Sequence, residues 1–238
     1  MIETTHGIVL SNLRYSDTSL ILRIFTAEYG KITVIAKGAL GAKSKYGSSI
    51  QPLSYSDLEI YKKGTGMSML SKSEFAEYFP KIMNNYRNMS FAMAMIEAIN
   101  LTQEENAPNE GVFTLAVESL RFLNSGAEPL VVYFAFLYNL CDIMGFAMDL
   151  DVVNQRPWYY FSFQDGRVIQ ESFFGKKFAK ISDNQLTILK KLQIGEPTEL
   201  FKLKIYDTDK KIINTFFADY LSYHLEKSFY INSIDLIL

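Results

Sequence analysis

The sequence from Phe25 to Gly47 reads FTAEYGKITVIAKGALGAKSKYG. Its pattern predicts two strands joined by a tight turn at Tyr29-Gly30-Lys31, followed by a flexible basic loop. Between Gly30 and Ser56 there is no acidic residue, and there are four lysines, Lys31, Lys37, Lys43 and Lys45. Because the whole chain is slightly acidic, this local excess of positive charge favours contact with a nucleic-acid backbone.

The composition is that of a folded globular protein. Of 238 residues, 48% are hydrophobic and 21% are charged, and the net charge is −2. The first residues lack the basic and apolar segments of a signal peptide, so we expect a cytoplasmic protein. The uncharged run Pro129–Cys141 is too short to span a bilayer and predicts a buried helix. Cys141 is the only cysteine, which excludes an internal disulfide and a multi-cysteine metal site.

Charge divides the chain into three parts. Residues 1–81 carry a net charge of +3, residues 82–160 carry −6, and residues 161–238 carry +1. A change of sign near residue 80 is typical of a boundary between a basic module and an acidic one. We therefore expect one domain at residues 1–80 and another at 81–238.

The periodicity of the sequence also changes at Pro80. Short alternating runs and glycine turns before it predict a five-stranded OB-fold barrel. After it, helical spacing predicts a mainly helical domain, with a β-hairpin insertion at about residues 151–172 whose turn is Asp165-Gly166. The predicted fold class is thus α+β, and the predicted helices cover residues 83–101, 109–123, 129–145, 183–192 and 209–227.

No group of residues suggests catalysis. His6 and His224 are the only histidines, and His224 falls on the mostly apolar side of a predicted helix, which favours a packing role. Residues 38–44 resemble a phosphate-binding loop but lack its spacing. We therefore expect no enzyme activity, no metal and no cofactor.

Single-stranded nucleic-acid sites combine cations along a groove with aromatic rings on which bases stack. The barrel sequence offers both, and the candidate DNA-binding residues are Arg14, Arg23, Lys31, Lys37, Lys43, Lys45, Lys62, Lys63 and Tyr46. Alternatively, the tyrosines are half-buried strand residues and the lysines only keep a sheet edge soluble. The strand positions leave both interpretations open. The loop positions Lys37, Lys43 and Lys45 favour function, because no acid interleaves with them.

These motifs, taken together, resemble the N-terminal signature of the bacterial recombination mediator family RecO. The residues that carry the resemblance are Gly7-Ile8-Val9-Leu10, Arg14-Tyr15, Phe25-Thr26, Glu28, Gly30-Lys31, Ala36-Lys37-Gly38-Ala39, Lys43-Ser44, Gln51-Pro52 and Leu58-Glu59. A weaker similarity continues at Tyr133-Phe134, Phe136-Leu137 and Gly145, and at Tyr220–Leu225. The resemblance thus covers most of the chain.

The resemblance implies a protein of DNA repair and recombination, located in the cytoplasm at the nucleoid. Such a protein binds single- and double-stranded DNA and anneals complementary strands. With the RecR partner it helps to load the RecA recombinase onto DNA coated by single-strand-binding protein, whose C-terminal tail it contacts. By motif match, Lys37, Lys43 and Lys45 fall on the basic loop of the family, and Arg14 falls on its first basic position.

The sequence departs from the family pattern in two places. Many members carry a four-cysteine zinc module where this chain has Asp151–Ile169 without cysteine, so we expect the aromatic hairpin to replace the metal by packing. Leu40 stands where the family often has arginine, which implies about one phosphate contact fewer.

Two alternatives to the mediator interpretation remain. A protein-interaction scaffold with weak DNA contact is favoured by the acidic net charge and the apolar run Pro129–Cys141. An enzyme acting on nucleic acid lacks residues for the chemistry.

Overall fold

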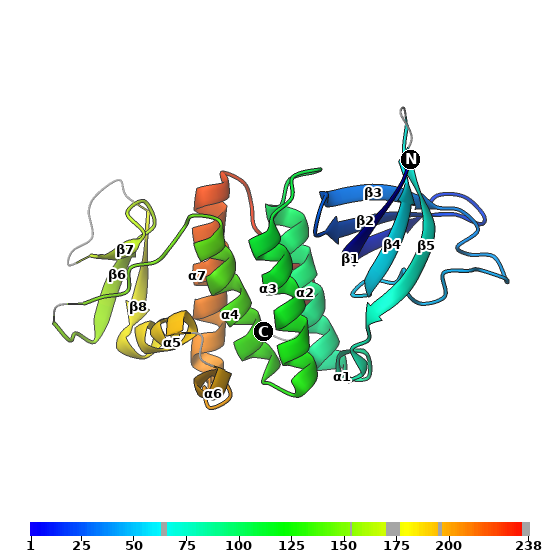
Figure 1. The fold of residues 1–238 in the computed structure, drawn as a ribbon. Helices are drawn as coiled ribbons and strands as arrows, with labels where there is room; N and C mark the ends of the chain where they lie inside the picture. Colours follow the sequence, from blue (N-terminus) through cyan, green and yellow to red (C-terminus); the bar gives the residue numbers. More distant parts are fainter. Residues whose placement is uncertain (63–65, 153, 170–176, 195–196, 235–238) are drawn as a thin grey trace. The chain divides into compact units, whose positions relative to one another are not determined.

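The computed structural model describes the chain except for residues 63–65, 153, 170–176, 195–196 and 235–238. The chain forms two compact units, Met1–Arg121 and Phe122–Leu238. The first holds a five-stranded barrel and the second is mainly helical, which confirms the predicted α+β class (Figure 1). In the described ranges, no helix is long and apolar enough to cross a membrane.

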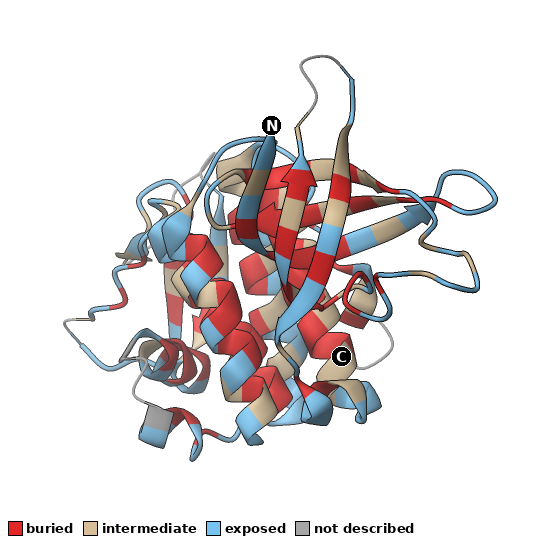
Figure 2. Cartoon of the chain, turned by 45° about the vertical axis from the view of Figure 1, so that its right-hand side comes forward, coloured by how far each residue is buried: buried red, intermediate tan, exposed pale blue. Residues whose placement is uncertain are grey.

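The barrel closes in the strand order β1-β2-β3-β5-β4. Its strands are β1 (Ile2–Arg14), β2 (Leu20–Thr26), β3 (Gly30–Ala36), β4 (Tyr55–Tyr61) and β5 (Ser68–Glu77). All neighbours are antiparallel except β3 and β5, which run parallel. Alternate residues of each strand point inward, and Figure 2 shows this as buried and paler bands along the strands.

Strand β1 is much longer than its apolar run Gly7–Leu10 suggests. Polar residues flank that run, and the pairing with β2 shifts register between Val9 and Ser11. A bulge of this kind inserts a residue and interrupts the alternation, so the full strand could not be recognised from its pattern.

The barrel continues into helices within its own unit. Helices α1 (Pro80–Met83) and α2 (Tyr86–Thr102) belong to this unit. Helix α3 (Glu110–Ser125) follows them, and all but its last residues belong to the unit as well. Asn109 caps α3 as predicted, because its side chain accepts a hydrogen bond from the Val112 N–H at 3.1 Å. The barrel strands are complete before residue 80, but the compact unit continues to Arg121. The domain boundary at residue 80 stays a prediction.

A close approach at Gly30 joins the barrel to the segment between α2 and α3. The β2–β3 turn holds Gly30 at φ +66°, in the left-handed region. A Cβ atom at Gly30 would lie 2.2 Å from the Ala107 carbonyl oxygen. The position therefore requires glycine for its backbone conformation and for space.

The second unit packs its helices beside a small sheet. Its helices are α4 (Pro129–Ile143), α5 (Asp183–Ile194), α6 (Pro197–Leu200) and α7 (Asp207–Leu225), and a 3-10 turn covers Asn232–Ile234. Strands β6 (Trp158–Ser162), β7 (Arg167–Ile169) and β8 (Phe178–Ser182) pair in the order β7-β6-β8. The predicted hairpin is β6–β7, and the third strand, β8, was not foreseen.

Aromatic rings from β6 and α7 form the core beneath this sheet. Phe161 is fully buried and lies edge-on to Phe216 and Tyr220, with ring centroids 5.2 and 5.5 Å away. His224 extends the cluster: its ring stacks on Phe146 at 4.5 Å and meets Tyr220 edge-on at 4.5 Å. His224 thus packs against aromatic rings, as the sequence led us to expect.

Burial lowers the pKa of His224 below its usual value, although a backbone hydrogen bond at Phe163 acts in the opposite direction. Its Nε2 atom is buried and has no hydrogen-bond partner among the described residues. The folded protein therefore favours the neutral imidazole.

We predict that Gly30→Ala destabilises the protein by about 2–4 kcal/mol, because the new methyl group combines a left-handed backbone with a clash. Gly38→Ala is the matched control, since Gly38 has φ +72° and nothing within 4 Å of a Cβ. It should cost only the backbone strain of about 1 kcal/mol. Chemical denaturation measures both, and equal losses would contradict the clash at Gly30.

We also predict that stability falls as the pH drops below about 6.5, the usual histidine value. The unfolded His224 then takes up a proton that the folded state resists, so the unfolded state gains. Thermal melts at pH 7.5 and 5.5 should show a smaller loss for His224→Gln and His224→Phe than for the parent. An equal pH dependence in all three proteins would exclude His224 as a cause.

Candidate nucleic-acid interface

The loop between β3 and β4, residues 37–54, carries the lysines that the sequence singled out. Lys37, Lys43 and Lys45 are all exposed. The loop is not a loose arm, because it folds into successive turns and its Leu40 N–H donates to the Thr18 carbonyl at 3.0 Å. This bond ties the loop to the β1–β2 turn. The three ammonium groups therefore project from a connected surface.

Strand register adds Arg14 to the same end of the barrel. Arg14 pairs with Leu20 on β2, and Leu20 pairs with Ala36 on β3, directly before Lys37. The exposed Arg14 guanidinium lies 3.5 Å from the Asp17 carboxylate. An ion pair between exposed groups contributes little, so Arg14 can exchange this partner for a phosphate at low cost.

Tyr46 has a different role from the stacking surface that its sequence suggested. It is only 4% exposed, and it packs in the barrel core with Ile50 and Leu70. Its hydroxyl donates to the Leu70 carbonyl at 2.8 Å. A ring buried in this way cannot stack on a base, so the prediction of Tyr46 as a DNA-binding residue is wrong. Tyr46 instead anchors the loop to the barrel.

Arg23 and Lys31 face the end of α2 rather than the loop. Lys31 is 8% exposed, and its ammonium donates to the Asn100 carbonyl at 2.8 Å. Arg23 donates to the Asn100 side-chain oxygen at 3.2 Å and lies 3.6 Å from Glu105. Lys31 thus satisfies a main-chain carbonyl in the last turn of the helix, where positive charge is favourable, and Arg23 binds side chains at the same helix end. The geometry places them in the barrel–helix contact, away from the loop lysines.

Lys62 is half-buried and is also held by partners on the barrel. Its ammonium lies 2.6 Å from the Glu3 carboxylate and 3.7 Å from the centre of the Tyr29 ring. The hydrogen bond from Lys62 lowers the pKa of Glu3, which keeps this carboxylate charged. Lys63 lies outside the described residues.

Sequence reasoning missed an apolar row on the outer face of the barrel. It runs across neighbouring strands in register and passes through Leu13, Ile21, Ile35, Met69 and Tyr61. Leu13 is 68% exposed and Tyr61 42%, and the other three are partly exposed. The row begins one residue before Arg14 and passes two residues before Lys37. The sequence did contain a signal for this row, because apolar residues also occupy outward-facing positions of the alternating strands.

Acidic side chains gather on another part of the barrel. Asp57, Glu59 and Glu74 line a hollow of about 330 Å³ on β4 and β5, together with Glu28 and His6. The His6 ring nitrogen lies 2.6 Å from Asp57. His6 precedes Arg14 by eight residues along β1, or roughly 25 Å of strand. This acidic hollow is thus separated from the loop end, where Asp17 is the acidic residue beside the cations and is paired with Arg14.

In the part of the chain that the structure describes, no three histidine, cysteine, aspartate or glutamate side chains come together to hold a metal ion. The cations, the apolar row and the anchored loop are suited to binding a polyanion that also has apolar surface.

Two family models match the chain, one after the other. The family described as Recombination protein O N terminal matches residues 1–79, and Recombination protein O C terminal matches residues 83–230. The two matches meet close to the end of β5.

Curated relatives match nearly the whole chain. The DNA repair protein RecO of Bacillus pumilus is 25% identical, over 99% of this chain and 95% of the relative. That of Alkaliphilus metalliredigens is 28% identical, over 95% of each. That of Bacillus subtilis is 24% identical, over 99% of this chain and 96% of the relative. With both family domains matched in order, the chain belongs to the RecO family of DNA repair and recombination proteins.

Proposed function

We propose that this chain is a recombination mediator that binds single- and double-stranded DNA at the loop end of its barrel. The observation that carries the proposal is the cluster of exposed cations there, namely Arg14, Lys37, Lys43 and Lys45. Residues 30–56 contain no acid that would cancel this charge. The outer apolar row from Leu13 to Tyr61 lies beside the cations and offers surface to unpaired bases.

The mechanism that follows is charge neutralisation without catalysis. Two complementary strands repel each other through their phosphates, and a protein that neutralises both lowers this repulsion and raises their encounter rate. Contacts to phosphate carry no sequence information, so little sequence preference follows. Leu40 is 47% exposed near the start of the loop and supplies no charge there.

The family relationship supports the wider role. In this proposal the protein acts in the cytoplasm at the nucleoid, where it works with RecR and contacts the tail of single-strand-binding protein. RecA is reached indirectly, through loading onto the coated strand. The scaffold alternative loses one argument, because the apolar helix α4 is buried and offers no free face. A salt-insensitive partner complex with negligible DNA binding would still favour the scaffold.

Strand annealing tests the proposal directly. We expect the protein to accelerate annealing of complementary oligonucleotides, both bare and coated with the cognate single-strand-binding protein. The acceleration should fall steeply between low and high salt, because released counterions drive the binding. No acceleration by a folded protein would contradict the mediator role.

We further predict that Lys43→Ala combined with Lys45→Ala weakens binding to all DNA sequences alike. Loss of two phosphate contacts should reduce the slope of log affinity against log salt by about 1.4 for single strands. Fluorescence anisotropy over a salt series measures this slope. The control is Lys202→Ala with Lys204→Ala, which has the same spacing and charge change at exposed positions of the second unit. An equal slope in both double variants would exclude the loop as a contact.

A further inference from the structure

The three-stranded sheet of the second unit has one buried and one open face. Tyr159, Phe161 and Ile181 point into the core and are at most 4% exposed. The alternating residues point outward. Trp158 is 49% exposed and Phe178 is 39% exposed, which is unusual for such large apolar side chains.

Register places the outward residues in one connected surface, which we call the aromatic platform: Trp158, Tyr160, Ile169, Arg167, Phe178 and Lys180. Tyr160 of β6 lies opposite Ile169 of β7 and Lys180 of β8. Ser162, next on the same face of β6, lies opposite Arg167 and Phe178. The rings of Tyr160 and Phe178 meet edge-on at 5.3 Å.

Charge on the platform is of one sign. Strands β6, β7 and β8 contain Arg167 and Lys180 and no acidic residue. The Lys180 ammonium lies 4.8 Å from the centre of the Trp158 ring. Asp165, in the β6–β7 turn, accepts a hydrogen bond from the Ser162 hydroxyl at 2.7 Å and so is held at the turn. Rings and cations therefore alternate along the three strands, and among the described residues the Asp165 carboxylate lies at the turn end of this face, bonded to Ser162.

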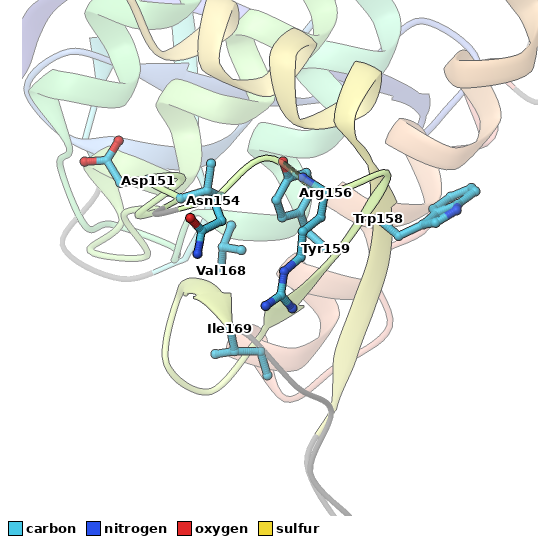
Figure 3. Close-up of a pocket in the computed structure, with 8 residues that line it drawn as sticks. Asp151, Asn154, Arg156, Trp158, Tyr159, Val168 and Ile169 are labelled. Carbon is cyan, nitrogen blue, oxygen red and sulfur yellow. Dashed lines mark hydrogen bonds between the residues drawn. The ribbon is translucent and has the colours of Figure 1, made fainter.

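A pocket of about 140 Å³ adjoins the platform and shares Trp158 and Ile169 with it. Figure 3 shows the Arg156 side chain reaching toward Ile169, whereas the Trp158 indole points away from the pocket. The indole is therefore presented on the open side of the sheet and is not used to fill the pocket.

We propose that this platform is a second binding site for single-stranded nucleic acid, separate from the barrel loop. Unpaired bases stack on Trp158, Tyr160 and Phe178, while Arg167 and Lys180 neutralise the neighbouring phosphates. Flat sheets that carry exposed aromatic rings bind unpaired bases in this way. An apolar peptide anchor would instead need a deep pocket for its side chain, and the platform rings stand out from the sheet.

The choice of ligand rests on the proposed function, but the site itself can be tested apart from it. Trp158 is the only tryptophan in the chain, so fluorescence excited selectively from tryptophan, and not from the 15 tyrosines, reports on this platform. We expect a short oligodeoxythymidylate to quench this fluorescence saturably in the full-length protein, and added salt to weaken the effect. The quenching should persist in the Lys43→Ala, Lys45→Ala double variant, at higher DNA concentration.

Variants separate stacking from a remote effect. Phe178→Ala should shift the quenching midpoint roughly ten-fold, the expected loss for one stacked base. Tyr206→Ala removes an equally aromatic, 66% exposed side chain outside the sheet and should leave the midpoint unchanged. Lys180→Gln alters charge without removing a ring and should reduce the salt slope of quenching by about 0.7.

Three outcomes would overturn the platform. DNA that binds by anisotropy but leaves Trp158 fluorescence unchanged would remove the site and keep the barrel proposal. Equal midpoints for Phe178→Ala and Tyr206→Ala would show that bases do not stack there. Quenching by an acidic peptide but not by the oligonucleotide would make the face a protein-binding surface. Conversely, quenching that survives while the loop variant binds as tightly as the parent would support the platform and contradict the loop.

Discussion

Strand β1 has to pair with two neighbours, and this double pairing closes the barrel. Its residues Ile2–Ile8 pair with β4, and its residues Gly7–Arg14 pair with β2, so Gly7 and Ile8 pair on both sides. Because β2 pairs with β1 on one side and with β3 on the other, the end of β1 and the end of β3, where the basic loop starts, lie at the same end of the barrel. Arg14 and Lys37 share this end with β2 between their strands, although Lys37 follows Arg14 by 23 positions in the sequence.

The same type of side chain performs three different tasks on this barrel. Lys31 satisfies a helix carbonyl, Lys62 is paired with Glu3 beneath a tyrosine ring, and Lys43 projects into solvent. Only the last arrangement leaves the charge for a polyanion. Burial and partners, rather than residue type, decide which cations on a basic module are able to bind DNA.

Much of the architecture could be predicted from the sequence because local signals were strong. The alternation Leu20, Leu22, Ile24 fixed the inward face of β2, and the Asn109 cap fixed the start of α3. The Asp165-Gly166 turn likewise located β6 and β7. Strand β8 was not predicted because its five residues include a lysine and a small alanine, which makes the alternation of apolar and polar residues weak.

The site was harder to predict, since it depends on contacts between distant residues. The sequence around Lys31 does not indicate that its ammonium binds the Asn100 carbonyl, 69 positions away. Tyr46 follows two exposed lysines and looks like a surface residue until the barrel closes over it. The apolar row also exists only after the strands are in register, since its members come from five separate strands.

The anchoring of Tyr46 has a consequence for the entropy of binding. Its hydroxyl bond to Leu70, with Ser49 bonded to both the Tyr46 and Ser73 carbonyls, restrains the chain just after Lys43 and Lys45. An unanchored loop would lose conformational freedom when it binds a DNA strand. In this loop that freedom is already lost on folding. The lysine backbones are thus held at a fixed spacing while their long side chains extend into solvent. In the proposed function, such a surface would bind an irregular phosphate chain without first having to order itself, and so would suit a partner that must be released as readily as it is captured.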